Sequence, residues 1–234
     1  MTIKSPVILA IDTSDLDIAR QWIETTRDYI SGYKLGLEFF AAFGTKGVKK
    51  LRDVCDADLF LDLKLHDIPN TVAGAAKQVA DLSPRFLTVH ASGGREMVSA
   101  AVKAAPQIEI TAVTILTSLS DQDLQEIGFA HTALESAVAL ARLAQRAGAR
   151  AIVCSPHEIS AIRDGVGPEL TIISPGVRPV DEPGNDQART MSPRDAIANG
   201  ATYLVIGRPI TRHWVLGADA MRDRAAAIAE ELTL

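Results

Sequence analysis

Short apolar runs rich in β-branched residues recur along the whole chain, and their number constrains the fold more than any other feature. Turn-forming residues bound each run, and segments with apolar residues at helical spacing separate the runs. The eight runs predicted to be strands are residues 7–12, 33–37, 59–65, 86–90, 109–116, 151–154, 170–174 and 203–206. Because strands alternate with helices, the sheet is predicted to be parallel. Eight such units in 234 residues favour a closed (β/α)8 barrel, the TIM barrel, with an open sheet as the alternative.

The segments between the strands indicate a single α/β domain. Residues 134–147 have apolar side chains at helical spacing, and an alanine-rich helix is expected over residues 217–232. No linker or change in composition interrupts the alternation, so residues 1–234 are predicted to form one barrel. Functional groups of such barrels project from the carboxyl ends of the strands. Polar residues at those ends are therefore the candidates for a site.

Composition and charge exclude several classes of protein. A chain that is 47% hydrophobic and 23% charged has enough apolar surface to form a core, which excludes a disordered protein. The net charge of −5 gives no overall field that would attract nucleic acid or acidic lipid, so neither partner is expected. The first residues lack a signal-peptide pattern, and no apolar stretch approaches the about 20 residues that span a bilayer. We expect a soluble, cytoplasmic protein.

The third predicted strand carries charges where an apolar run would be expected. Because side chains alternate along a strand, Asp62 and Lys64 share one face and the neighbouring leucines take the other. With the leucines under the helices, both charges point into the barrel mouth, and Asp67 follows just beyond the strand end. A purely structural ion pair is the alternative. Lys34 and Asp12, at the ends of the second and first predicted strands, favour a functional site instead.

Other residues of chemical interest are expected to be structural. His66 is predicted to be a neutral ring that is hydrogen-bonded to the backbone. Cys154 lies in an apolar run and is predicted to be a buried free thiol, distant in sequence from Cys55. No spacing of His, Cys and carboxylate residues matches a metal site, so neither a metal nor a cofactor is expected.

A phosphate site is predicted at the end of the eighth strand. Gly207 allows close approach of the backbone to a ligand, and Arg208 adds a forked, permanently charged donor. Gly-Arg alone is a weak signal, but phosphate commonly binds after strands seven and eight of such barrels. Residues 178–191 form a polar loop long enough to be a lid. The alternative is a surface insertion in which Gln187 is merely solvated.

These residues stand in segments that resemble one known family, the orotidine 5'-monophosphate decarboxylases. In the family's order the segments are LAID (9–12), YKLG (33–36), DLKLHDIPNT (62–71), VHASGG (89–94), VTILTS (113–118), PGVRP (175–179), GNDQAR (184–189) and VIGRP (205–209). The resemblance spans almost the whole chain. Its departures are small: Leu65 stands where an aromatic residue is as common, and Ser174 stands where threonine is usual. Neither changes the expected chemistry.

The resemblance implies a cofactor-free enzyme of de novo pyrimidine biosynthesis that converts orotidine 5'-monophosphate into uridine 5'-monophosphate and CO2. It implies that Lys64 protonates C6 of the pyrimidine and that Asp62 and Asp67 hold the ammonium group of Lys64. It also implies a homodimer in which Asp67, Ile68 and Thr71 reach the site of the neighbouring subunit. By the same resemblance, Asp12 and Lys34 hold the ribose hydroxyls, and Thr117 and Ser118 approach the pyrimidine. Gln187, Gly207 and Arg208 hold the phosphate, and Arg178 supports the closed lid.

Two other functions remain open at this point. Sugar-phosphate decarboxylases and aldolases of the same superfamily resemble the chain in the pattern Asp-x-Lys-x-x-Asp, but they use magnesium held by acidic ligands. The steps Thr117-Ser118 and Asp186-Gln187 are more typical of the nucleotide enzyme. A barrel that only binds a phosphorylated ligand is the second alternative, and the presence of Lys64 argues against it.

Overall fold

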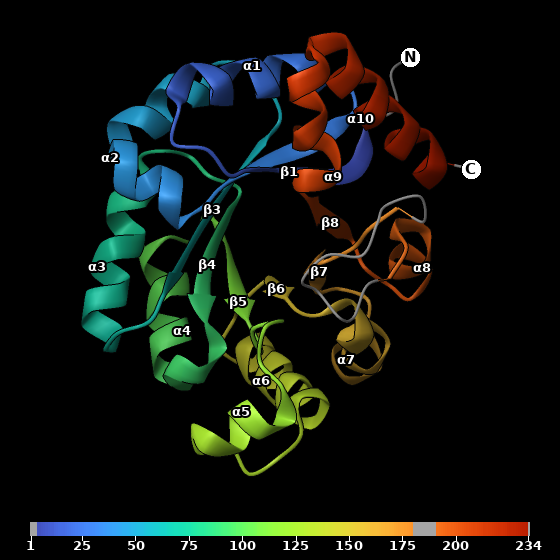
Figure 1. The fold of residues 1–234 in the computed structure, drawn as a ribbon. Helices are drawn as coiled ribbons and strands as arrows, with labels where there is room; N and C mark the ends of the chain where they lie inside the picture. Colours follow the sequence, from blue (N-terminus) through green and yellow to red (C-terminus); the bar gives the residue numbers. More distant parts are fainter. Residues whose placement is uncertain (1–3, 180–190, 234) are drawn as a thin grey trace.

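The computed structural model describes residues 4–179 and 191–233. Their strands are all parallel and form a closed barrel in the order β1 to β8, with β8 pairing back onto β1 (Figure 1). The strands are β1 Ser5–Ile11, β2 Ile30–Leu35, β3 Asp58–Leu65, β4 Phe86–His90, β5 Glu109–Val113, β6 Ala151–Val153, β7 Thr171–Pro175 and β8 Tyr203–Ile206. The predicted (β/α)8 barrel is confirmed, and the open sheet is wrong.

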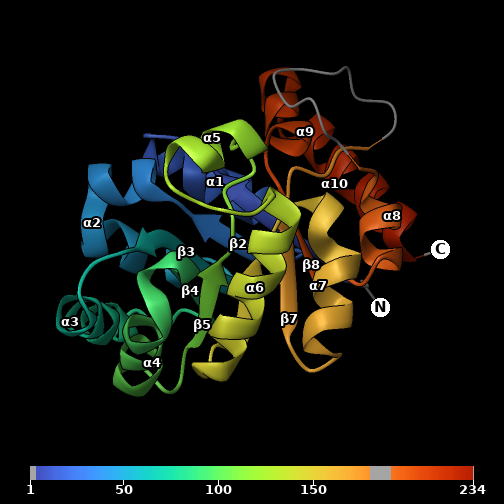
Figure 2. The same cartoon turned by 90° about the horizontal axis from the view of Figure 1, so that it is seen from below.

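Helices surround the barrel and cover the outer face of the sheet (Figure 1). The α-helices are α1 Leu16–Thr26, α2 Leu37–Arg52, α3 Pro69–Ala80, α4 Gly94–Ala104, α5 Asp121–Glu126, α6 Ala133–Arg146, α7 Ile159–Val166, α8 Pro193–Ala198, α9 Arg208–Thr211 and α10 Ala218–Thr233. Short 3-10 helices are η1 Ala91–Gly93, η2 Pro156–Glu158 and η3 Arg212–Leu216. Helices α5 and α9, which follow the carboxyl ends of β5 and β8, lie at the same end of the barrel (Figure 2). No helix in the described ranges is long and apolar enough to cross a membrane.

Alternation along the strands divides the core into two layers. Leu9, Leu61 and other outward residues pack beneath the helices in the larger cluster. Inward residues fill the barrel in a smaller cluster: Ile8, Ala10, Phe60, Phe86, Ala151, Ile173 and Val205. Phe86 makes edge contacts with Phe60 and Tyr203, at ring centroid distances of 5.6 and 5.8 Å. The interior below the barrel mouth is therefore filled by packed side chains, which fixes the strands that carry the site.

Charged residues close the amino-terminal end of the barrel. The guanidinium of Arg85 donates to the Asp58 carboxylate at 2.6 Å and to the Glu109 carboxylate at 3.1 Å. It also donates to the Tyr203 hydroxyl at 2.9 Å. Since these three residues begin β3, β5 and β8, one arginine ties together strands from both sides of the barrel.

Some predicted strand limits were wrong by a few residues. Leu37 was placed at the end of the second strand but begins α2, with Gly36 as the N-cap residue. It is an exposed leucine, 56% accessible, so its apolar character did not indicate burial. The fifth strand ends at Val113 rather than at residue 116. Ile115 is buried although it lies outside the strand, which explains why the apolar run is longer than the strand.

Candidate functional site

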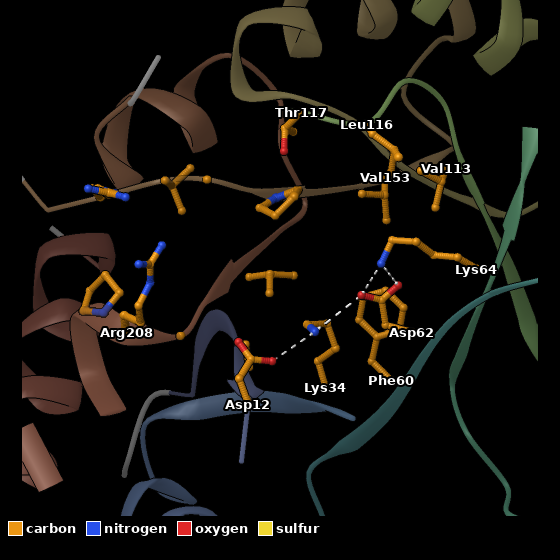
Figure 3. A pocket seen from close by; sticks show the side chains of 18 of the residues that line it. Asp12, Lys34, Phe60, Asp62, Lys64, Val113, Leu116, Thr117, Val153 and Arg208 are labelled. Carbon is orange, nitrogen blue, oxygen red and sulfur yellow. Dashed lines mark hydrogen bonds and ion pairs between the residues drawn. The ribbon is translucent and has the colours of Figure 1, made fainter. Parts of the chain in front are cut away.

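A cavity of about 390 Å3 opens at the carboxyl ends of the strands (Figure 3). Eight of the predicted site residues line it: Asp12, Lys34, Asp62, Lys64, Thr117, Arg178, Gly207 and Arg208. They come from β2 and β3 and from the segments that follow β1, β5, β7 and β8. Lys64 and Arg208 lie on opposite sides of the cavity (Figure 3). The site can therefore hold an elongated ligand between a charged array and an arginine.

Four charges of alternating sign form a continuous array along the first three strands. The Lys64 ammonium lies 2.8 Å from both carboxylate oxygens of Asp62. The Lys34 ammonium lies 3.4 Å from Asp62 Oδ2 and 3.7 Å from Asp12 Oδ1. These contacts bring together the residues that strand alternation predicted to face inward (Figure 3). Each lysine in the array lies beside a carboxylate, and Asp62 lies between both lysines.

Asp62 remains a carboxylate in spite of its burial. Its side chain is only 13% exposed, and burial alone would raise its pKa. The charges of Lys34 and Lys64 outweigh this effect, together with hydrogen bonds from Lys64 and Thr88. The pKa of Asp62 is therefore held below its ordinary value, and the anion can balance two ammonium groups in a low-dielectric site.

Lys64 has an unusual backbone conformation. Its φ of 48° lies in the left-handed region, which non-glycine residues rarely adopt. The pairing of β3 with β4 is irregular here. Leu61 pairs with Leu87, but the next paired residue of β3 is Leu65, which pairs with Val89, so β3 has two extra residues in this stretch. Such a bulge re-aims a side chain, and strain of this kind is concentrated at functional sites.

The side of the cavity where phosphate is predicted to bind is formed by residues that follow β7 and β8. Gly207 precedes α9, and a Cβ atom at this position would lie 3.1 Å from Ala10 Cβ, so a larger residue would crowd the barrel wall. Arg208 and Arg178 both line the cavity. The Arg178 amide donates to the Met191 carbonyl at 3.0 Å, which holds the two ends of the predicted lid together. Residues 180–190 of that loop, including Gln187, lie outside the described residues.

Four predicted site residues do not line the cavity of their own chain. Asp67, Ile68 and Thr71 lie beyond the end of β3 and are exposed. The Asp67 carboxylate accepts a hydrogen bond from the Ile68 amide at 2.6 Å, and Ile68 is 66% accessible. Ser118 is also exposed and lies outside the lining, whereas its neighbour Thr117 contributes to it.

Sequence reasoning missed two parts of the lining. Phe60, Val113, Leu116 and Val153 form an apolar wall close to Lys64 (Figure 3). Three of these residues could have been predicted from the sequence, because Phe60 shares the inward face of its strand with Asp62 and the two valines end their strands. Arg212 also lines the cavity, one helical turn after Arg208, and this spacing could have indicated it.

The residues predicted to be structural give a mixed result. Cys154 is a fully buried free thiol, as predicted, and Cys55 is free and partly buried. His66 was predicted to be hydrogen-bonded to the backbone, but within the described residues its exposed ring makes no such bond, so this prediction was wrong. The ring centroid of His66 lies 5.3 Å from that of His90. Within the described ranges, no three His, Cys, Asp or Glu residues are grouped to hold a metal ion.

Fold and site together define a closed (β/α)8 barrel with a charged cavity at the carboxyl ends of its strands, the position of the active site in barrel enzymes. A sequence profile of the Orotidine 5'-phosphate decarboxylase / HUMPS family matches residues 5–219. The chain belongs to this family.

Individual relatives agree with the family assignment. The chain is 50% identical to "Orotidine 5'-phosphate decarboxylase" of Thermobifida fusca over 228 residues, covering 97% of this chain and 96% of the relative. It is 44% identical to the protein of the same name from Rhodospirillum rubrum, covering 98% and 94%. A crystal structure of orotidine 5'-phosphate decarboxylase from Lactobacillus acidophilus superposes with a TM-score of 0.84 at 32% identity, covering 99% and 100%.

The lowered pKa of Asp62 predicts a pH-dependent contribution to stability. An aspartate with a depressed folded-state pKa stabilises the fold above its ordinary value of about 3.9, and this stabilisation is lost as the pH falls through the folded-state pKa. The free energy of unfolding of the wild type, minus that of Asp62→Asn, should therefore be larger at neutral pH than at acid pH. Urea unfolding across this range measures the difference, and Asp223→Asn at an exposed position of α10 gives the background. A difference that stays constant or grows on acidification contradicts the ionised state assigned to Asp62.

Proposed function

We propose that the chain decarboxylates orotidine 5'-monophosphate to uridine 5'-monophosphate and CO2, a step of pyrimidine biosynthesis, with Lys64 as the proton donor. The observation that carries this proposal is the Lys64 ammonium, fixed 2.8 Å from both oxygens of Asp62 at one side of the cavity. The names of the relatives support the substrate. A cytoplasmic location stays a prediction from the sequence.

The reaction poses a specific electrostatic problem. When the bond between C6 and the carboxylate breaks, its electron pair remains on C6 in an orbital that lies in the ring plane. The pyrimidine π system cannot delocalise this pair, so the protein must stabilise it by preorganised charge. A cation beside C6 meets this need, and Lys64 then transfers a proton from Nζ to C6. The products are CO2 and the nucleotide with hydrogen at C6.

The neighbours of Lys64 prepare it for this role. Asp62 keeps a negative charge against the ammonium and fixes its position before substrate binds, so little reorganisation is needed during the reaction. The apolar wall of Phe60, Val113, Leu116 and Val153 limits water beside Nζ. A drier site strengthens the attraction between the ammonium and the developing charge at C6.

The other predicted site residues are assigned to the rest of the nucleotide. Asp12 and Lys34 are placed to hold the ribose hydroxyls, and Thr117, with Ser118 next to it, to contact the pyrimidine. Arg208, Gly207 and Gln187 are assigned to the phosphate, and Arg178 is assigned to support of the lid predicted over residues 178–191. Binding energy from the phosphate is remote from the reacting bond and can serve to orient the ring.

Replacing Lys64 tests the proposed proton donor. Lys64→Ala should abolish nearly all CO2 release while the melting temperature stays close to that of wild type, because Lys34 and Thr88 still compensate the Asp62 carboxylate and the Lys64 side chain lies outside the core. Lys103→Ala, at an exposed position of α4, is the matched control and should keep full turnover. Turnover of Lys64→Ala within about tenfold of wild type, a barrier change of ~1.4 kcal/mol, would contradict the assignment.

We further propose that two chains form a homodimer with shared active sites. Asp67, Ile68 and Thr71 are exposed and make no part of their own cavity, although they directly follow the strand that carries Lys64. An isoleucine that is 66% accessible at this position fits burial against a second chain. In a two-fold dimer the contact is reciprocal, so Asp67 would complete the partner's charge array while the partner completes this one.

Hybrid dimers test the shared site. Lys64→Ala and Asp67→Ala are each expected to be inactive as homodimers. After subunit exchange, a hybrid holds one site with both lesions and one site with neither. Random mixing makes half of the dimers hybrid, so about a quarter of all sites should recover activity. If Lys64 and Asp67 served the same site from one chain, every site would keep one lesion, and mixing would restore no turnover.

A further inference from the structure

Thr88 makes two hydrogen bonds that converge on the charged array. It lies in the middle of β4 and is fully buried. Its Oγ1 accepts a hydrogen bond from the Lys64 amide at 2.7 Å and donates to Asp62 Oδ1 at 3.1 Å. The direction is fixed, because an ionised carboxylate can only accept. One hydroxyl therefore connects the backbone of Lys64 to the carboxylate that faces its ammonium.

The irregular pairing of β3 with β4 explains why a side chain makes the first of these bonds. Four steps along β3, from Leu61 to Leu65, face only two steps along β4, from Leu87 to Val89. Residues within this bulge depart from regular ladder pairing. The Thr88 hydroxyl gives the Lys64 amide an acceptor there, and a buried amide without one would be costly. Thr88 thereby supports the left-handed backbone of Lys64.

The neighbouring strand offers a comparison. Thr111 on β5 pairs in register with Thr88 and is equally buried. Its hydroxyl donates to the Glu109 carbonyl at 2.9 Å, within its own strand, and it is not part of the cavity lining. The two threonines thus share burial and residue type, but only Thr88 contacts the array.

We propose that Thr88 is a positioning residue for the decarboxylation. Its hydroxyl holds the Lys64 backbone and the Asp62 carboxylate in one arrangement, so that Nζ lies where C6 is protonated. This inference rests on the proposed role of Lys64. Thr88 takes no part in the chemistry and does not touch substrate. Its loss should therefore reduce the rate of the bound complex and leave nucleotide binding largely intact.

Variants that differ only in the hydroxyl test this role. Thr88→Val keeps the shape and removes the hydroxyl, and we expect kcat to fall about 10- to 100-fold with little change in KM, as for a misplaced catalytic group. Thr88→Ser keeps the hydroxyl and should retain kcat within about threefold of wild type. Thr111→Val removes an equally buried hydroxyl and should leave both constants unchanged. If Thr88→Val does not fold, Thr88→Ala replaces it, since alanine and serine also differ by one oxygen.

The outcomes separate this inference from the role of Lys64. If the variant without the hydroxyl keeps the wild-type kcat while Lys64→Ala is inactive, the role of Thr88 is overturned and the role of Lys64 is retained. If kcat falls equally in the serine variant and in the hydroxyl-free variant, Thr88 acts through packing and the inference is overturned. A rise in KM that matches the fall in kcat also overturns it. An active Lys64→Ala enzyme overturns both. A fall in kcat that serine prevents, with Lys64→Ala inactive, supports it.

Discussion

The contact between the Asp62 carboxylate and the Lys64 ammonium governs how the mouth of this barrel is built. A carboxylate that is 13% exposed would be unstable without compensation, which Lys34, Lys64 and the Thr88 hydroxyl supply. Lys34 in turn lies beside Asp12, so the array reaches from β3 to the end of β1. The closed barrel brings these strand ends together, and an open chain of the same sequence would leave the charges in water.

Charged arrays of this kind contribute little net stability, because desolvation offsets much of the attraction between the charges. The fold is therefore stabilised elsewhere: by the layer beneath the helices, by the packed interior around Phe60 and Phe86, and by Arg85 at the opposite end. This division allows strain at Lys64 to be tolerated. The bulge in β3 and the hydrogen bonds of Thr88 are local to the site. The pairing of β4 with β5 keeps one register along its whole length.

The alternation of eight strands with helices was sufficient to predict the barrel. Side-chain alternation along the third strand was sufficient to predict the inward positions of Asp62 and Lys64. The conformation of Lys64 and the contacts of Thr88 could not be predicted in this way, since both depend on the register between two strands. Leu37 was misplaced because apolar character does not distinguish an exposed helix start from a strand end. The exposure of Asp67 follows from its position in the turn beyond β3.

We propose that Lys64 and its carboxylate neighbours promote the decarboxylation of orotidine 5'-monophosphate without a metal ion. The most direct measurement is CO2 release from this nucleotide by purified protein, before and after exhaustive treatment with a chelator. Undiminished turnover after chelation, with the ultraviolet change of the pyrimidine matching the CO2 released, is the predicted result. No turnover of the nucleotide, or turnover that chelation removes and magnesium restores, would contradict the claim and favour the magnesium-dependent sugar-phosphate chemistry of the superfamily.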